Sequence, residues 1–237
     1  MRKTILFSMM MFLITSFLLP SCSKDDEPTI NIPSSISVNV GSSYNFGVEG
    51  DWSSSNDFVA SVSNKGVVNG EHVGDCDITV GNKRCKVSVK GTINLYIDPI
   101  TEWGMSKSMV IAKWGEKDYI DTGDNIGYTT GNTNVPLIAY NFENGKLAAA
   151  IVMVSTNYTS KLIDYLLERY ESLGIYDNDF FFINNYTLQS ATTVIGVQLY
   201  NVDYWEIIYM PNTYTKSREI DKSDIENDLN ILMSLLD

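Results

Sequence analysis

The chain contains few residues that could build a catalytic centre. A serine, threonine or cysteine nucleophile needs a neighbouring base, which histidine usually supplies. His72 is the one histidine in the sequence, and it lies in a turn-rich stretch close to Gly74. We therefore expect His72 to be a solvent-exposed loop residue. The sequence also lacks G-x-S-x-G, H-E-x-x-H, Walker-type and G-x-G-x-x-G motifs, which disfavours hydrolase, zincin and nucleotide-binding functions.

Carboxylates are plentiful, with 29 Asp and Glu residues against 17 Lys and Arg. A facing pair could catalyse glycoside hydrolysis, but on so acidic a chain most carboxylates hydrate the surface. Two acidic turns, at residues 121–125 and 177–179, could offer oxygens to calcium, yet neither has EF-hand spacing and both favour Asx turns. The acids concerned are Asp121, Asp124, Asp177 and Asp179. We predict no enzyme, no cofactor and no metal site, with calcium at these turns left open.

Cys76 and Cys85 could form a disulfide in an oxidising compartment, but their spacing argues against it. A turn at residues 81–84 between paired strands would place Cys76 opposite Val89, four positions along the strand from Cys85. At about 3.3 Å per residue this separation exceeds the Cα distance of about 7 Å that a disulfide tolerates. The sequence predicts two buried thiols that behave as small hydrophobic groups.

Aromatic side chains give the positive indication of a binding role, since the chain has 14 tyrosines and 4 tryptophans. Several are expected at strand ends or on an outer face: Tyr119, Tyr128, Tyr186, Tyr204, Trp205 and Tyr214. Both faces of the expected strand 204–210 carry apolar groups, so one face should pack on helices and the other could bind sugar or protein. A terminal helix or the first domain could equally cover that second face. The candidate ligand-binding residues are Tyr204, Trp205, Tyr209 and Tyr214.

The first 21 residues have the pattern of an export signal. Arg2 and Lys3 precede the uncharged apolar run 4–20, which is shorter than the roughly 20 apolar residues of a membrane span. The sequence Leu19-Pro20-Ser21-Cys22 resembles the lipobox of bacterial lipoproteins. This resemblance implies cleavage before Cys22 and a lipid on its thiol, whereas an ordinary secretory signal with an incidental cysteine is the alternative.

Residues 22–28 form a short acidic tether, which is too polar to pack into a core. The acidic run after Cys22 is similar to the surface-export signal of some Gram-negative lipoproteins. We therefore expect a cell-envelope lipoprotein of the outer membrane, facing either the periplasm or the exterior.

Net charge excludes one class of partner. Removing residues 1–21 removes Arg2 and Lys3 and no acid, so the net charge falls from −12 to −14. Such a surface repels phosphate backbones, and we expect no nucleic-acid binding. The 216 remaining residues (237 minus 21) suffice for two modest domains.

Residues 29–91 read as an all-β sandwich of short strands separated by turns. The expected strands are Ser35 to Val40, Ser43 to Val48, Val59 to Ser63, Val67 to Asn69, Cys76 to Val80 and Cys85 to Val89. Four spaced pieces of this region resemble the group 2 bacterial immunoglobulin-like domains of intimins and invasins. They begin at Trp52 (WSSSN), Val59 (VASVS), Gly66 (GVVNG) and Gly74 (G followed by ITV). The resemblance implies a spacer or adhesive module without catalysis.

Residues 92–237 predict an α+β domain made of two helix-strand-strand-strand repeats with an antiparallel sheet. The expected helices are Ser106 to Trp114, Thr159 to Leu173 and a terminal amphipathic helix Ser223 to Leu236. The expected strands are Tyr119 to Thr122, Leu137 to Phe142, Leu147 to Ser155, Phe180 to Asn184, Thr193 to Tyr200 and Tyr204 to Met210. The arrangement resembles the folds of the TATA-binding protein and the beta-lactamase inhibitor protein.

These patterns leave three functions open. The favoured one is a surface-exposed binding or adhesion module for a glycan or a protein, anchored through lipid. The second is a structural or inhibitor-like subunit that contacts a partner protein, and the third is an enzyme with a carboxylate-only site.

Overall fold

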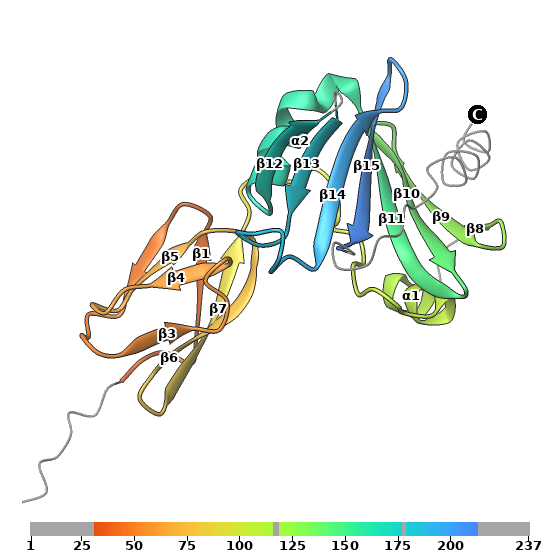
Figure 1. Cartoon of the computed structure of the whole chain (residues 1–237). Coiled ribbons are helices and arrows are strands. Elements are labelled where there is room, and N and C mark those ends of the chain that lie inside the picture. The colour runs from red at the N-terminus through yellow and green to blue at the C-terminus, as the bar shows by residue number, and fades with distance from the viewer. Residues whose placement is uncertain (1–30, 116–118, 177–178, 213–237) are drawn as a thin grey trace, which may run out of the picture. The chain divides into compact units, whose positions relative to one another are not determined.

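The computed structural model describes residues 31–115, 119–176 and 179–212 (Figure 1). By its internal contacts the chain consists of two compact units, Met1–Asn31 and Ile32–Asp237. Cys22, Tyr214 and the expected helix 223–236 lie outside the described residues. Within the described ranges, no helix combines the length and the apolar character that a bilayer span requires.

The first described region is a sandwich of two small sheets, with strand orders β1-β7-β6-β3 and β2-β5-β4. Its buried side chains alternate along the strands, as in Cys76, Ile78 and Val80. Most of them, including Cys76 and Ile78, form one core. Strand β3 was not predicted from the sequence. The strands are β1 Ser35–Asn39, β2 Ser43–Asn45, β3 Trp52–Ser54, β4 Ala60–Val62, β5 Val67–Gly70, β6 Gly74–Val80 and β7 Lys83–Lys90.

The two cysteines of the sandwich are free and buried, as predicted. The predicted register was wrong, because the turn contains two residues rather than four. Val80 pairs with Lys83 across the turn, so Cys76 lies opposite Val87 and Cys85 lies opposite Ile78. The two cysteines are therefore diagonal neighbours, whose Cα atoms lie about 7–8 Å apart in an antiparallel ladder.

The expectation of an exposed His72 was also wrong. The side chain is only 9% exposed, its ring stacks on Phe58 with centroids 3.9 Å apart, and its Nδ1 lies 2.8 Å from the Phe58 carbonyl oxygen. Because a carbonyl can only accept, Nδ1 carries the hydrogen in this bond. His72 fills a packing position.

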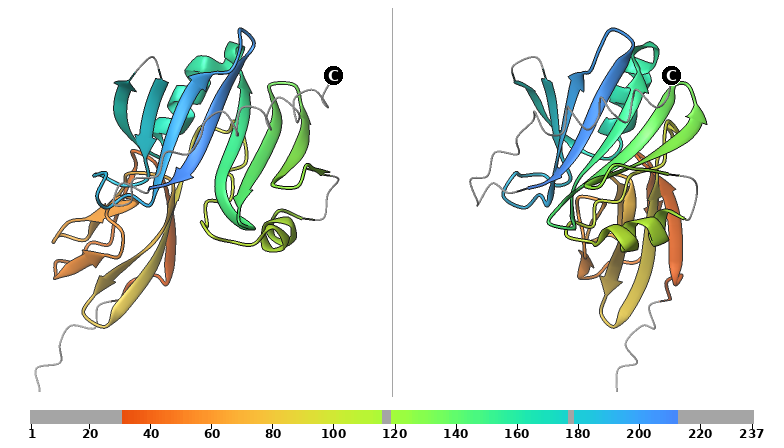
Figure 2. Two further views of the ribbon diagram at one scale, coloured as in Figure 1. Left: turned by 45° about the vertical axis from the view of Figure 1, so that its right-hand side comes forward. Right: turned by 90° about the vertical axis from the view of Figure 1, so that its right-hand side faces the viewer.

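The second described region is built on one eight-stranded antiparallel sheet, the large sheet, with the order β12-β13-β14-β15-β11-β10-β9-β8. Figure 2 shows its pronounced twist. The strands are β8 Ile120–Asp121, β9 Asn125–Asn132, β10 Val135–Glu143, β11 Lys146–Ser155, β12 Glu171–Tyr176, β13 Asp179–Ile183, β14 Thr193–Leu199 and β15 Tyr204–Pro211.

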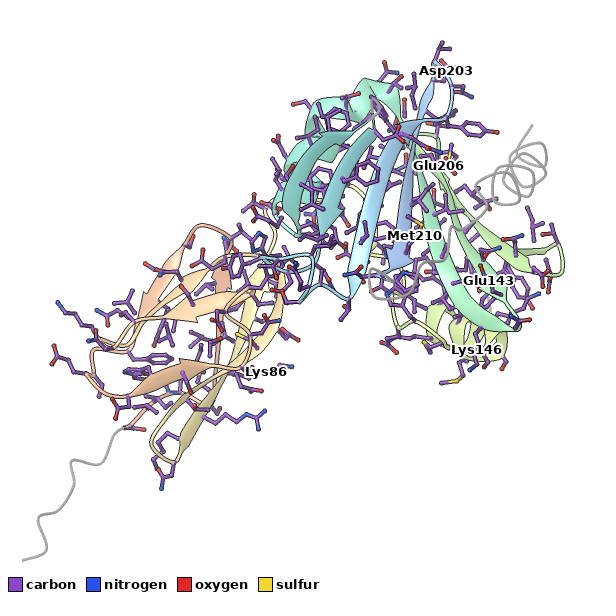
Figure 3. The ribbon with its side chains drawn as sticks, in the orientation of Figure 1. Lys86, Glu143, Lys146, Asp203, Glu206 and Met210 are labelled. Carbon is purple, nitrogen blue, oxygen red and sulfur yellow. The ribbon has the colours of Figure 1, made fainter. Side chains whose placement is uncertain are left out.

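The hairpin between β10 and β11 confirms a local prediction. Asn144 and Gly145 have positive φ values of 51° and 73°, which a two-residue turn of type I′ requires. Glu143 and Lys146 are paired across it, and both are labelled in Figure 3.

Two short α-helices accompany the sheet, α1 (Lys107–Trp114) and α2 (Thr159–Leu167). Helix α1 begins and ends where the sequence predicted: the Ser106 side chain accepts a hydrogen bond from the Met109 amide, and Gly115 follows the last turn. Short 3₁₀ helix η1 (Thr156–Tyr158) precedes α2.

The predicted second helix was too long. Residues 171–173 belong to edge strand β12, which pairs with β13, so the sheet overrides the helical pattern of this stretch. Strand β9 was missed as well. In the described residues each helix is followed by four strands, where three were expected, and the region is mostly β-sheet with two short helices.

The two faces of the large sheet differ in what covers them. Both helices and the segment before α1 pack on one face, here called the helix face, through residues that include Ile100, Val110 and Tyr165. A smaller cluster on the opposite face contains Leu137, Met153 and Ile208.

Candidate ligand-binding pocket

The aromatic residues that the sequence singled out do not form one surface. Trp205 and Tyr209 lie on the helix face, whereas Tyr204 packs on the opposite face. The Trp205 indole donates a hydrogen bond to the Thr159 hydroxyl at 2.7 Å, and Tyr209 is completely buried. Tyr214 lies outside the described residues.

The space beside Trp205 is too small for a ligand. It amounts to about 20 Å³ between α2 and the sheet, with Leu162 and Phe182 among its walls. That volume holds roughly one water molecule. Trp205 therefore packs helix α2 against the sheet.

A larger cavity, of about 280 Å³, opens on the helix face near the other end of the sheet. This value lies just below the range of roughly 300–1,000 Å³ typical of small-molecule sites. Its lining is Leu95, Tyr96, Ile97, Trp114, Tyr128, Thr129, Thr130, Asn132, Val135 and Ile138. We call it the Trp114 pocket.

Helix α1 and strands β9 and β10 position the aromatic wall. Trp114 is the last residue of α1, whose Val110 is fully buried in the core of the helix face. The Trp114 ring lies 5.6 Å from the Tyr128 ring of β9 and 5.7 Å from the Tyr140 ring of β10. These separations suit favourable aromatic contacts, so the wall is held by packing on both strands.

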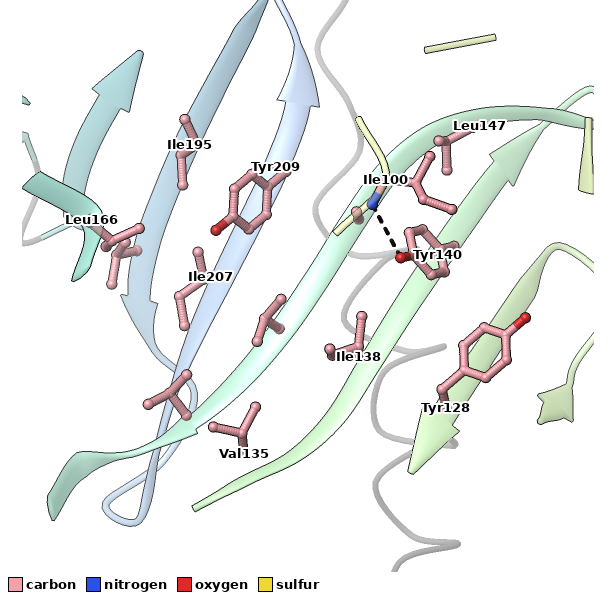
Figure 4. Close-up of a cluster of buried hydrophobic side chains, with 14 of the residues drawn as sticks. Ile100, Tyr128, Val135, Ile138, Tyr140, Leu147, Leu166, Ile195, Ile207 and Tyr209 are labelled. Carbon is pink, nitrogen blue, oxygen red and sulfur yellow. Dashed lines mark hydrogen bonds between the residues drawn. The ribbon is translucent and has the colours of Figure 1, made fainter. Parts of the chain in front are cut away.

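Two tyrosines of this aromatic cluster differ in hydrogen bonding. The Tyr140 hydroxyl accepts a bond from the Ile100 amide at 3.2 Å, drawn as a dashed line in Figure 4. Tyr128 is only 3% exposed, and its buried hydroxyl has no hydrogen-bond partner among the described residues. Burial raises the pKa of Tyr128, and the nearby Tyr119 raises it further, so the hydroxyl stays protonated. A buried unpaired hydroxyl is uncommon in folded proteins.

The segment before α1 forms the opposite wall of the Trp114 pocket. The Tyr96 hydroxyl lies 2.7 Å from the Tyr209 hydroxyl, and burial raises the pKa of Tyr96 well above its usual value. Tyr165 of α2 donates a hydrogen bond to the Tyr96 carbonyl at 3.3 Å. The neighbouring Ile97 is 72% exposed, which leaves an apolar side chain at the mouth of the pocket.

Polar groups at the rim come from the end of β9. The Asn132 side-chain oxygen accepts a hydrogen bond from the Asn134 amide at 2.9 Å. Its side-chain nitrogen makes no bond within the described part of the chain, and Asn132 is exposed. Thr130 donates to the Val135 carbonyl. Among the described residues that line the pocket, none carries a carboxylate, ammonium, guanidinium or imidazole group.

The acidic turn at Asp121 is an Asx turn, as predicted. The Asp121 carboxylate accepts a hydrogen bond from the Gly123 amide at 2.9 Å and one from the Lys107 ammonium at 2.5 Å. The hydrogen bond from Lys107 is the main reason that the pKa of Asp121 is lowered, and the Gly123 amide adds to it. Within the described ranges, no group of three or more His, Cys, Asp or Glu side chains could hold a metal ion.

Tyr128 is among the aromatic residues that the sequence predicts at strand ends or on an outer face, but no sequence pattern predicts the pocket. Trp114 was expected only as the last residue of the helix 106–114, and residues 95–97 belong to none of the expected elements. A tryptophan at the last position of a short capped helix was the available signal.

Comparison with known families supports the immunoglobulin-like resemblance. Residues 30–93 match the bacterial Ig-like domain (group 2) family, which confirms the resemblance for the sandwich. None of the curated proteins matches the chain.

Proposed function

We propose that this protein is a binding module of the bacterial cell envelope, in which the Ig-like sandwich is a spacer and the large-sheet region recognises a neutral saccharide. The Trp114 pocket would hold one sugar ring. The observation that carries this proposal is the aromatic wall of Trp114 and Tyr128 around a cavity whose described lining residues are all uncharged.

The chemistry of a sugar ring matches the pocket. A pyranose presents an apolar C–H face that stacks on aromatic rings, and it presents hydroxyls that both donate and accept hydrogen bonds. The Asn132 amide at the rim supplies a donor for those hydroxyls. A charged ligand would be buried there without a counter-ion, which is costly.

Binding fits this site better than catalysis. Hydrolysis of a glycoside requires two carboxyl groups on either side of the bond, and the described residues of the pocket lining supply none. The group 2 Ig-like match also favours adhesion, since such domains often serve as modules of surface adhesins.

The location in the envelope is part of the proposal. Cleavage before Cys22 and lipid on its thiol would tether the protein to the outer membrane through residues 23–28. Mass spectrometry of the native protein tests this: retention of Met1 or an unmodified Cys22 would contradict it.

Glycan-array binding followed by calorimetry tests the saccharide. The protein used is residues 22–237 with Cys22→Ser, which leaves no site for lipid. We expect binding to neutral glycans that Trp114→Ala weakens by about tenfold or more, as expected for loss of one stacking contact worth about 1.4 kcal/mol. Tyr44→Ala is the control, because Tyr44 is an exposed aromatic residue of the sandwich.

Two outcomes would contradict the proposal. One is the absence of binding to any neutral glycan, and the other is equal affinity in the wild type and Trp114→Ala. Circular dichroism of each variant ensures that the comparison is made between folded proteins. Capture of a protein ligand by a glycan-negative chain would instead favour the partner-binding alternative.

A further inference from the structure

The face of the large sheet opposite α1 and α2 is more deeply buried than the described residues around it explain. Leu137 and Met153 are fully buried, and Ile208 is 8% exposed. Ala139 and Ile151 complete this cluster, which we call the second-face cluster. It extends over the three adjacent strands β10, β11 and β15.

The described residues supply no layer over this cluster. Its partly buried neighbours, Ile120, Tyr200, Tyr204 and Met210, belong to sheet strands or to the β14–β15 hairpin. Both helices and residues 93–105 contribute instead to the cluster on the helix face. A sheet face without a second layer would leave side chains at its centre open to water.

Glycines flank the second-face cluster in one row across the sheet. Ala139 is paired with Gly127 on one side and Ile151 on the other, and Ile151 is paired with Ile208. Ile208 is in turn paired with Gly196. Gly127 and Gly196 are themselves buried, although neither has a side chain to cover its backbone.

The dimensions of the cluster fit one helix. Three adjacent strands span two spacings of about 4.8 Å, or about 10 Å, and an α-helix with side chains is about 10–12 Å across. Gly127 on one side and Gly196 on the other carry no side chain, which leaves a helix over β11 room between β9 and the Phe181 ring, 3.7 Å from where a Cβ on Gly196 would lie. A second sheet would instead require a broader apolar face.

The chain that continues beyond β15 has a suitable sequence. Asn212 is fixed by hydrogen bonds from its side-chain nitrogen to the carbonyls of Leu188 and Ala191 at 2.6 and 2.9 Å. Residues 213–237 follow, and they contain apolar positions at helical spacing: Ile225, Leu229, Leu232 and Leu236. The connection from 212 to 225 can extend about 43 Å, more than the roughly 14 Å of three strand spacings from β15 to β9.

We propose that residues 223–236 dock as an amphipathic helix on the second-face cluster and complete a three-layered second domain. The stripe of Ile225, Leu229, Leu232 and Leu236 contacts Leu137, Met153 and Ile208. This face is therefore an internal surface, and ligand recognition is left to the helix face.

Methyl NMR tests the contact without changing the protein. In protein labelled at Met and Leu methyl groups, we expect nuclear Overhauser effects between the Met153 ε-methyl and the methyls of Leu229 and Leu232. Assignment uses Met153→Leu and Leu229→Ile. Absence of these effects would overturn the proposal. Effects seen only between differently labelled copies would also overturn it, because a second copy would then cover the face.

A charge pair of variants provides an independent measurement. Leu229→Asp places a carboxylate in the proposed interface, whereas Asn227→Asp places the same charge on the opposite side of the helix. We expect Leu229→Asp to lower Tm by roughly 5–10 °C and to increase binding of the dye ANS, with Asn227→Asp close to wild type. Equal behaviour of the two variants would overturn the proposal.

Discussion

The Glu168 carboxylate accepts hydrogen bonds from the backbone amide of Thr92 at 2.9 and 3.0 Å. The next amide, of Ile93, donates to the same carboxylate at 3.0 Å. Glu168 directly follows helix α2, so it fixes the first residues of the segment before α1 to the end of α2. Helix α2 thus ends at the residue whose carboxylate binds the Thr92 and Ile93 amides.

Glu168 should make stability depend on pH. Burial raises the pKa of Glu168, but hydrogen bonds from Thr92 and Ile93 and the charge of Arg169 outweigh it, so the net pKa lies below 4.5. A carboxyl with a depressed folded pKa stabilises the protein above its unfolded pKa, and this contribution is lost as pH falls through the folded pKa. We expect Glu168→Gln to cost about 1–3 kcal/mol at pH 7 and progressively less below pH 4.5.

Urea unfolding between pH 3 and pH 7 measures this dependence. Glu49→Gln serves as the control, because Glu49 is exposed in the sandwich. A constant difference between wild type and Glu168→Gln across that range would show that the carboxylate does not titrate as described.

Removing the hydroxyl from two neighbouring tyrosines should have opposite effects. Tyr128→Phe removes a buried hydroxyl without a partner, and we expect a gain of up to about 1 kcal/mol. Tyr140→Phe leaves the Ile100 amide without its acceptor, and we expect a loss of about 1–2 kcal/mol. Denaturant unfolding of both variants gives the comparison. Effects of the same sign would mean that the Tyr128 hydroxyl has a partner in solution.

Alanine substitutions at two glycines of the sandwich should distinguish the cost of backbone strain from the cost of a steric collision. Gly41 and Gly66 have nearly equal positive φ values of 74° and 73°. A Cβ at Gly41 would meet nothing within 4 Å, whereas one at Gly66 would lie 2.6 Å from the Val48 carbonyl oxygen. We expect Gly41→Ala to cost about 1–2 kcal/mol and Gly66→Ala clearly more.

The fluorescence of Trp52 should detect the collision that a Cβ at Gly66 would cause. Its indole donates to the Val48 carbonyl at 3.0 Å, and a Cβ at Gly66 would lie 3.1 Å from its ring. Gly66→Ala should therefore shift Trp52 fluorescence, with Gly41→Ala unchanged. Similar losses of stability in the two variants would show that the loop relaxes around the added methyl.

The thiols of Cys76 and Cys85 should be unreactive in the native protein. Burial raises the pKa of both thiols, so little thiolate is present at neutral pH. In the Cys22→Ser protein, we expect DTNB to label neither thiol before unfolding and both afterwards. Reductant should leave Tm unchanged. A disulfide found by mass spectrometry would contradict the two free thiols.

Local sequence determined the features that depend on a few neighbouring residues. Ser106 and Gly115 delimit α1, and Asn144-Gly145 makes the tight hairpin, because capping and positive φ are properties of individual residues. The spaced pieces between Trp52 and Val80 were sufficient to identify the Ig-like sandwich. Acidic composition and the absence of catalytic motifs likewise needed no structure.

Tertiary structure decided what depends on residues far apart in the chain. Residues 171–173 continue a helical pattern, yet pairing with β13 and the use of Glu168 as an acceptor make them part of β12. The Trp114 pocket joins side chains from residue 95 to residue 138, and no local periodicity connects them. Trp205, chosen from strand alternation, proved to be a packing residue because helix α2 lies over its face. Alternation tells which residues share a face, but only the packed fold tells which face is covered.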